Sequence, residues 1–147
     1  MEVYQASMED LEEVSRLFNL YRIFYEQPSD RAGAEDFIEE RLTQKDSVIF
    51  TIKEKDRYLG FTQLYPSFSS VSMKKTWILN DLFVAEEARK KGAGELLMNK
   101  AREFAEETGA KSLSLSTAFN NHSAQRLYER LGYKRDEQYF HYELALK

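Results

Sequence analysis

The sequence predicts a mixed α/β fold, with a mostly antiparallel central sheet, one parallel strand–helix–strand crossover and about four flanking helices. Three observations predict this fold. Apolar residues recur at helical spacing in four stretches, at 7–25, 31–42, 95–107 and 121–131. Three strand-like stretches lie between the second and third helices with short connections, which is typical of an antiparallel meander. A strand, a helix and a strand then follow between residues 76 and 116, which favours a right-handed parallel crossover.

The chain begins with a predicted strand at 2–6, followed by a helix that starts at Ser7. Serine is a good N-cap residue, and Asp10 stands three positions later, where an acidic side chain completes a capping box. The Gln27-Pro28 pair interrupts the helical pattern. A second helix is therefore expected over 31–42.

The meander is predicted to contain strands at 48–53, 58–65 and 76–84. A charged turn joins the first two strands. Pro66 is expected to end the second strand, because proline cannot donate a backbone hydrogen bond. A Ser-rich loop over 67–72 is expected to lead to the third strand.

The last third of the chain alternates helices and strands. Gly109 ends the predicted helix at 95–107, since glycine is the common residue just after a helix. A short strand at 111–116 and a helix at 121–131 follow. The chain is expected to finish as a hairpin formed by residues 133–135 and 138–146. The sequence leaves open whether these strands pair within one chain or across a dimer.

Composition excludes several kinds of protein. The 147 residues contain no linker or repeat, so a single domain over 1–147 is expected. The chain has no cysteine, which excludes disulfides and zinc–thiolate sites, and its two histidines disfavour a histidine-rich metal site. A net charge of −4 gives no support to nucleic-acid binding. No apolar run approaches the ~20 residues of a membrane span, so a soluble, cytoplasmic protein is expected.

Residues 78–95 carry the strongest local signal. An apolar strand ends at Val84, three basic residues and two glycines follow at 89–94, and a helix then begins. The first N–H groups of a helix carry a partial positive charge, and glycine lets a ligand approach the backbone. This arrangement indicates a phosphate site at the carboxyl end of a sheet strand. The alternative is a solvated basic loop.

Two motifs resemble those of one known family. Asp81-Leu82-Phe83-Val84, followed by Arg89-Lys90-Lys91-Gly92-Ala93-Gly94, is similar to motif A of the GNAT N-acetyltransferase superfamily. The segment 121–133, with Asn121, Ala124, Leu127, Tyr128 and Gly132, is similar to a later motif of that family. Two motifs in the right order are more specific than either alone. The nearest resemblance is to the branch that includes polyamine, amino-acid and protein N-acetyltransferases.

The resemblance implies the GNAT fold and acetyl-CoA as the acetyl donor, with no metal. In this family, the loop before the helix holds the pyrophosphate of CoA, and the preceding strand pairs with pantetheine through its backbone. The positions implied for the donor are Leu82, Phe83, Val84, Arg89, Lys90, Lys91, Gly92, Ala93, Gly94, Glu95, Asn121 and Tyr128. Asn121 is also a plausible N-cap, and the two roles use different atoms.

The resemblance gives Tyr128 the role of general acid toward the leaving thiolate; the alternative is a tyrosine packed at the core edge. Asp81 is the candidate for the general base or for anchoring a cationic acceptor. The alternatives are a hydrogen bond from Asp81 to a neighbouring loop and a water relay with no dedicated base. Asn80 departs from the pattern, because diamine acetyltransferases of this superfamily carry glutamate there and an amide cannot act as a base.

The acceptor side is expected near the first two helices. Tyr21, Phe24 and Tyr25 are the candidate aromatic wall, with Asn80 and Asp81 as polar neighbours. Aromatic rings beside carboxylates suit a cationic amine, and the alternative is a core edge. The implied function is an N-acetyltransferase acting on a small cationic amine, such as a polyamine or an amino acid. The alternatives are a lysine or N-terminal protein acetyltransferase and a non-catalytic module that senses acyl-CoA. A homodimer is expected by analogy with the family.

Overall fold

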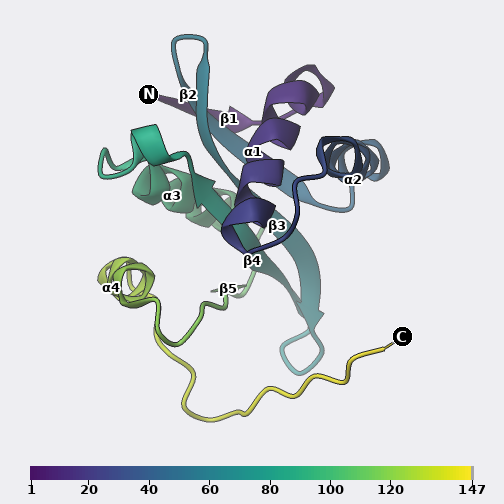
Figure 1. Ribbon diagram of the computed structural model, residues 1–147. Helices are drawn as coiled ribbons and strands as arrows, with labels where there is room; N and C mark the ends of the chain where they lie inside the picture. Colours follow the sequence, from purple (N-terminus) through teal and green to yellow (C-terminus); the bar gives the residue numbers. More distant parts are fainter. Residues whose placement is uncertain (147) are drawn as a thin grey trace. The chain divides into compact units, whose positions relative to one another are not determined.

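The computed structural model describes residues 1–146. The chain forms two compact units, Met1–Leu115 and Ser116–Lys147, and each is described by itself. The helices and strands of the first unit (Figure 1) are β1 (Glu2–Gln5), α1 (Leu11–Phe24), α2 (Arg31–Gln44), β2 (Val48–Glu54), β3 (Arg57–Ser69), β4 (Lys74–Val84), α3 (Ala93–Glu107) and β5 (Leu113–Ser114). Short 3₁₀ turns lie at Met8–Asp10 and Glu86–Ala88. The second unit contains α4 (His122–Arg130).

The first unit is built on a five-stranded sheet with the order β1-β2-β3-β4-β5. The first four strands are antiparallel neighbours. The last pair, β4 and β5, is parallel and is connected by α3. The predicted meander and parallel crossover are therefore confirmed.

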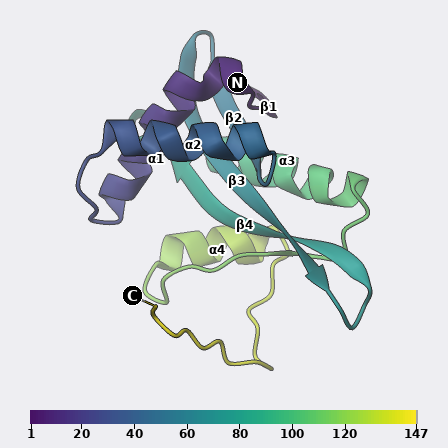
Figure 2. The same cartoon turned by 90° about the vertical axis from the view of Figure 1, so that its right-hand side faces the viewer.

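Helices cover both faces of this sheet, as adjacent residues of β2 illustrate. Ile49 belongs to the apolar cluster beneath α1 and α2, whereas the ring of Phe50 packs edge-on against Phe104 of α3 at 5.4 Å. Side chains alternate between the two faces of a strand. The helices α1 and α2 therefore lie on the face opposite α3, as Figure 2 shows.

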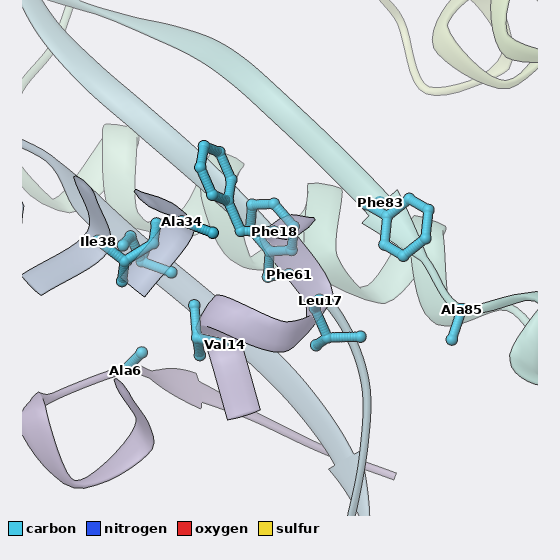
Figure 3. Close-up of a cluster of buried hydrophobic side chains, with 10 residues drawn as sticks. Ala6, Val14, Leu17, Phe18, Ala34, Ile38, Phe61, Phe83 and Ala85 are labelled. Atoms are coloured by element: carbon cyan, nitrogen blue, oxygen red, sulfur yellow. The ribbon is translucent and has the colours of Figure 1, made fainter. Parts of the chain in front are cut away.

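The core between α1, α2 and the sheet contains leucine, valine, isoleucine and stacked aromatic rings (Figure 3). Leu17 of α1 and Ile38 of α2 are fully buried. Burying such a side chain contributes about 1.5–3 kcal/mol. Phe18 of α1 stacks on Phe37 of α2 at 5.3 Å and meets Phe61 of β3 edge-on. This packing fixes α1 over the β3–β4 pair, where the polar site described below lies.

The start of the first helical segment has the predicted capping box. The backbone N–H of Ser7 donates to the Asp10 carboxylate at 2.9 Å, and the side chain of Ser7 accepts in return. The same carboxylate accepts from the hydroxyls of Tyr4 and Tyr58, at 2.7 and 2.6 Å. Asp10 therefore ties the capping box to β1 and β3.

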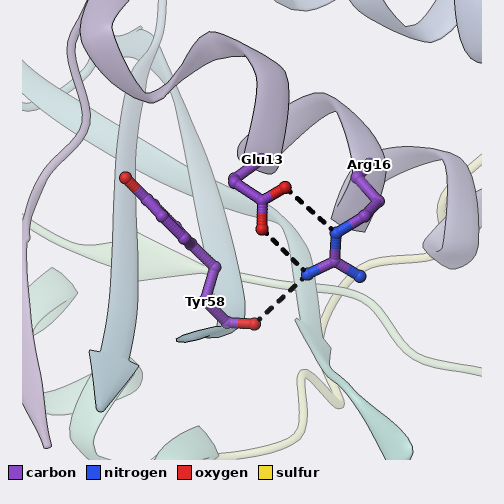
Figure 4. A network of polar contacts seen from close by, with 3 residues as sticks. All are labelled: Glu13, Arg16 and Tyr58. Carbon is purple, nitrogen blue, oxygen red and sulfur yellow. Dashed lines mark hydrogen bonds and ion pairs between the residues drawn. The ribbon is translucent and has the colours of Figure 1, made fainter. Parts of the chain in front are cut away.

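A surface contact adds a second link between α1 and β3 (Figure 4). The guanidinium of Arg16 donates to both carboxylate oxygens of Glu13 at 3.4 Å, and also to the backbone carbonyl of Tyr58 at 3.5 Å. These side chains are partly exposed, so the ion pair adds at most about 1 kcal/mol.

The prediction that Pro66 ends its strand is wrong. Strand β3 continues to Ser69, and Pro66 pairs with Trp77 of β4. The pairing of β3 with β2 stops at Leu64. Beyond that residue one edge of β3 has no strand partner in the described part of the chain, and proline is tolerated at such an edge. The connection to β4 is consequently a short turn at the tip of a long hairpin.

The C-terminal prediction also fails in part. The parallel strand β5 contains only Leu113 and Ser114, fewer residues than predicted. The predicted hairpin is wrong, because residues 133–146 form neither helix nor strand. Within residues 1–146, no helix is both long and apolar enough to cross a membrane.

Candidate active site

The site begins with an irregularity in β4. Gln63 of β3 pairs with Asp81, but the next residue, Leu64, pairs with Leu79. Asn80 is therefore an extra residue in β4, which makes a β-bulge. In a regular strand the side chains of Asn80 and Asp81 would point to opposite faces. The bulge instead lets the Asn80 amide donate to the Asp81 carboxylate at 3.1 Å.

Asp81 is only 5% exposed, and its carboxylate lies on the sheet face covered by α1, where Tyr21 forms a hydrogen bond with it. The side-chain amide of Gln63 donates to it at 2.7 Å, and Gln63 itself is fully buried. The hydroxyl of Ser47 donates to the amide oxygen of Gln63 at 2.8 Å, which fixes the orientation of that amide. Asp81 is thus held by a defined network and has no basic partner among the described ion pairs.

Burial raises the pKa of the Asp81 carboxyl above its ordinary value. Hydrogen bonds from Gln63, Tyr21 and Asn80 oppose this effect without cancelling it. Asp10, the other buried aspartate, behaves differently. Burial also pushes its pKa up, but donation from Tyr58, Ser7 and Tyr4 outweighs burial, and the pKa is lowered. Asp10 is therefore suited to a structural role, whereas Asp81 has the elevated pKa useful to a base.

Two tyrosines, Tyr21 and Tyr65, lie near the Asp81 carboxylate. Burial raises the pKa of Tyr21, and the charge of Asp81 and a hydrogen bond to it add to the effect. Burial and the same charge raise the pKa of Tyr65 to about 12. The ring of Tyr25 meets that of Tyr21 edge-on at 5.1 Å and is half exposed. The structure thus brings the predicted Tyr21 and Asn80 to Asp81, and Tyr25 packs against Tyr21.

Phe24, the third predicted wall residue, lies between Tyr25 and the basic loop. Its ring meets Tyr25 edge-on at 5.4 Å, and the guanidinium of Arg89 lies 5.7 Å above it. Arg89 is also 5.8 Å from the ring of Phe83, and its Nε donates to the Val84 carbonyl at 3.0 Å. In this structure the Arg89 side chain therefore joins the end of α1 to the end of β4.

The predicted phosphate loop contains two residues of positive φ directly before α3. Lys90 and Gly92 both have positive φ, 66° and 84°, and α3 begins immediately afterwards at Ala93. The N-cap of α3 is Gly92, which has no side chain to accept hydrogen bonds from the first turn. Lys90, Lys91 and Gly92 are exposed. The loop thus offers an accessible helix N-terminus with basic side chains beside it.

One edge of β4 is open beside this loop. On one side β4 pairs with β3 as far as Val84. On the other side it pairs with β5 only at Trp77 and Ile78. The backbone of residues 79–84 therefore has no strand neighbour on that edge within the described residues. Leu82, Phe83 and Val84 belong to this open segment, which can accept an added extended chain.

Asn121 and Tyr128 lie in the second unit. Asn121 is the N-cap of α4, and its side-chain oxygen accepts from the Ala124 N–H at 3.3 Å. Tyr128 is half-buried, and its ring centroid lies 6.2 Å from that of Tyr133. The arrangement of Asn121 matches the N-cap alternative considered above. The roles of these two residues toward the donor stay predictions.

The sequence interpretation missed Gln63, Tyr65 and Ser47. Gln63 had a usable signal, because it is a strongly polar residue in an otherwise apolar strand, Leu59 to Leu64. A buried amide requires partners, and the same reasoning singled out Asp81. Tyr65 and Ser47 had no such signal, since tyrosine is common in strands and serine is common before them. Among the described residues, no group of three or more potential metal ligands is found.

Comparisons with known proteins show the family of the chain. The model of the acetyltransferase (GNAT) family matches residues 14–133. The uncharacterized N-acetyltransferase YhfO of Bacillus subtilis (strain 168) is 49% identical over 142 residues, which cover 97% of this chain and 95% of the relative. The D-amino-acid N-acetyltransferase HPA3 of Saccharomyces cerevisiae is 34% identical over 79 residues, 54% of this chain and 49% of that protein.

A solved structure of an acetyltransferase is also similar to this chain. The crystal structure of a probable acetyltransferase shares 43% identity and a TM-score of 0.95, and the match covers 100% of this chain and 99% of the other. The family implies an acetyl-CoA cosubstrate and an amine acceptor. The chain belongs to the GNAT acetyltransferase family.

Proposed function

We propose that this acetyltransferase transfers the acetyl group of acetyl-CoA to the primary amine of a small cationic molecule, such as a polyamine or an amino acid. The observation that carries the proposal is the Asp81 carboxylate. It is buried, it has a raised pKa, Tyr21 and Tyr65 lie near it, and its strand also offers an open edge. A negative charge among aromatic rings favours a cationic ligand.

The donor side rests on the loop from Arg89 to Glu95 and on the open edge of β4. Acetyl-CoA supplies a reactive thioester and a thiolate leaving group. The N–H groups at the start of α3 and the side chains of Lys90 and Lys91 would hold the pyrophosphate. The backbone of Leu82, Phe83 and Val84 would align the pantetheine arm. For this, Arg89 would release the Val84 carbonyl to which it now donates.

The acceptor side rests on Asp81 and its neighbours. An alkylammonium group has a pKa of about 10.4, so it must lose a proton before its nitrogen can attack the thioester. Asp81 would first attract the ammonium group and then take its proton, directly or through water. Tyr21, Tyr25 and Phe24 would contact the carbon chain of the acceptor, and Asn80 would orient it. The yeast relative named above acts on D-amino acids, which supports a small amine as the acceptor.

Tyr128 would complete the reaction as the acid that protonates the departing thiolate. Its phenol is a suitable donor at neutral pH. Asn121 would add a hydrogen bond to CoA through its amide nitrogen, because its oxygen already caps α4. We also propose that the protein works as a homodimer.

A panel of amines tests the proposal. Thiol release from acetyl-CoA would be measured, after correction for hydrolysis, with polyamines, amino acids, aminoglycosides and lysine-containing peptides. We expect a small cationic amine to stimulate release well above the background. Stimulation by peptides alone would transfer the assignment to a protein acetyltransferase. Tight CoA binding with no stimulation by any amine would overturn the proposal and favour an acyl-CoA sensor.

A further inference from the structure

The Asp81 carboxylate is enclosed by its own hydrogen bonds. Asp81 is 5% exposed, and the amides of Gln63 and Asn80 donate to different oxygens of its carboxylate, at 2.7 and 3.1 Å. The hydroxyl of Tyr21 forms a third hydrogen bond with the same carboxylate. An ammonium group would have to displace one of these three donors to touch Asp81. A proton can reach the carboxylate without such a displacement only through one of the donors.

Of these three donors, the tyrosine hydroxyl is the one that can pass a proton on. A phenol both donates and accepts a hydrogen bond, so it can release its proton to a carboxylate while it takes another. The NH₂ group of a side-chain amide only donates, so Gln63 and Asn80 orient the carboxylate without carrying a proton to it. Ser47 holds the Gln63 amide in that orientation. Tyr21 is therefore the proton path that this network offers to Asp81.

The packing of the Tyr21 ring fixes the position of its hydroxyl. Phe61 of β3 pairs with Phe83 of β4. Gln63 pairs with Asp81 two residues away in each strand, on the same face of the sheet. The Tyr21 ring meets Phe61 edge-on at 5.7 Å and Phe83 at 6.2 Å, and its hydroxyl reaches Asp81 in the next pair. Tyr21 is only partly buried, so a ligand can touch it without entering the buried network.

We propose that Tyr21 is a further catalytic residue, which relays a proton from the acceptor amine to Asp81. An N–H bond of the ammonium group breaks as an O–H bond forms at the Tyr21 oxygen, and the original hydroxyl proton passes to the Asp81 carboxylate in the same step. The amine is then neutral and its electron pair can attack the thioester, Asp81 is a neutral carboxyl, and Tyr21 is again a phenol. The inference rests on the proposed function and adds a role for the hydroxyl to the contact made by the ring.

The charges around Tyr21 favour a transfer in which both protons move together. Burial, and the charge of Asp81 with it, raise the pKa of Tyr21, so the phenol gives up its proton only as it gains another. Burial also raises the pKa of Asp81, which brings it nearer to that of an amine. Two further titratable groups, Tyr25 of α1 and Tyr65 of β3, raise the pKa of Tyr21 as well. The pKa of Tyr65 is about 12, so this group stays uncharged up to pH 9.

The pH dependence of kcat/KM tests the relay, measured between pH 7 and 9 with the best amine of the panel. Tyr21→Phe keeps the ring and removes the hydroxyl. We expect kcat/KM for the amine to fall by about 10²-fold or more at pH 7, with an unchanged KM for acetyl-CoA. The variant then depends on amine that is already neutral in solution, and for an amine with a pKa of about 10.4 that fraction rises about tenfold per pH unit. The deficit should shrink accordingly, which a loss of packing would not produce.

Two further variants show whether the effect belongs to the relay. Tyr58→Phe is the matched control, because it removes a tyrosine hydroxyl from the other buried aspartate, Asp10, to which Tyr58 donates at 2.6 Å. It should retain kcat/KM and its pH dependence. The double variant of Tyr21→Phe with Asp81→Asn should be no slower than Asp81→Asn alone, because both changes interrupt the same path.

A proton inventory on the unmodified protein needs no variant. We expect kcat/KM to fall as a quadratic function of the deuterium fraction of the solvent, because two protons move together. A linear dependence would contradict the relay.

The outcomes separate the relay from the proposed function. An active protein whose Tyr21→Phe variant keeps kcat/KM at pH 7, or shows the same deficit from pH 7 to 9, would overturn the relay and leave the proposed function intact. Effects that multiply in the double variant would also overturn it, because Tyr21 would then act apart from Asp81. If no amine stimulates the unmodified protein, the proposed function fails and the relay fails with it.

Discussion

Two buried aspartates in this protein differ in what surrounds them. Asp10 accepts hydrogen bonds from two tyrosines and a backbone N–H, and Lys53 lies nearby, so its pKa is lowered. Asp81 receives weaker compensation for its burial, and its pKa is raised. The sequence singles out Asp81 through its polarity within an apolar strand. The sequence does not reveal the hydrogen-bond partners that determine the pKa of Asp81, because these come from α1, β3 and the bulge.

Gln63 tunes the pKa of Asp81 through one hydrogen bond. A donor to the charged form lowers the pKa of a carboxyl, so Gln63→Leu should raise the pKa of Asp81 further. A hydrogen bond to a charged group contributes about 1.5–3 kcal/mol, and one pKa unit corresponds to about 1.36 kcal/mol. We therefore expect the acid limb of the kcat/KM profile to move up by about one pH unit. Ser47→Ala, which retains the Gln63 amide, is the control and should shift the limb less. If the acid limb of Gln63→Leu stays at the pH of the unmodified protein, Gln63 has no effect on the reacting carboxyl.

Tyr128 is tested by removal of its hydroxyl. If Tyr128 protonates the leaving thiolate, Tyr128→Phe should lower kcat by about 10²-fold or more, with little change in the affinity for acetyl-CoA. Tyr133→Phe is a matched control on the neighbouring ring and should retain kcat. Single-turnover kinetics together with CoA binding would separate the two effects. An unchanged kcat in Tyr128→Phe would leave Tyr128 with a packing role alone.

Among the elements, those with strong local patterns were predictable and those that depend on a partner were not. The helices α1, α2, α3 and α4 are found close to their predicted bounds, because capping residues and apolar spacing determine them locally. Strand β3 runs past Pro66, because β2 begins only at Val48, opposite Leu64, and leaves that edge unpaired. Residues 138–146 have the alternation of a strand but form none, because a strand also needs a neighbouring edge.

The close approach of β3 and β4 depends on Gly60. A Cβ atom at this position would lie 2.5 Å from the carbonyl oxygen of Phe83, far inside normal contact. Gly60→Ala should push the end of β4 away and cost about 1–3 kcal/mol of unfolding free energy. Because the displaced segment is the proposed pantetheine edge, we also expect a higher KM for acetyl-CoA.

A second glycine provides the control for that experiment. Gly109 has a φ of 72° and no atom near the position of an added Cβ. Gly109→Ala should also lower stability, through backbone strain, but it should leave the KM for acetyl-CoA unchanged. Denaturant unfolding and initial-rate kinetics on both variants would check this. Equal KM values for acetyl-CoA in Gly60→Ala and Gly109→Ala would show that the end of β4 does not bind the donor.

At the scale of the whole molecule, the fold class follows from the order of elements, and the family from two motifs in the right order. The division into units 1–115 and 116–147 has no counterpart in the sequence. It therefore stays a prediction that the chain works as a single domain. It also stays a prediction that Tyr128 lies near the donor loop. Both predictions depend on contacts between residues that are far apart in the sequence, and no local sequence pattern encodes such contacts.

Binding of the donor should stabilise the whole protein. A ligand present at 100 times its dissociation constant adds about 2.7 kcal/mol to the free energy of unfolding. For a chain of this length that corresponds to a rise in Tm of about 5–11 °C, which a thermal scan with CoA can measure. Gly92→Asp should abolish the rise, because it places a carboxylate at the start of α3, where it repels the pyrophosphate, and strains the backbone at the positive φ of 84°. An undiminished rise in Gly92→Asp would contradict the pyrophosphate site.

The central claim is that Asp81 serves the acceptor amine in acetyl transfer. The most direct test is the pH dependence of kcat/KM, measured with the best amine of the panel, for the unmodified protein and Asp81→Asn. Asp10→Asn, which also removes a buried carboxylate, controls for damage to the fold. We predict that Asp81→Asn lowers kcat/KM by about 10²–10⁴-fold and flattens the acid limb, while Asp10→Asn keeps that limb. An Asp81→Asn enzyme with unchanged kcat/KM and an unchanged acid limb would contradict the claim.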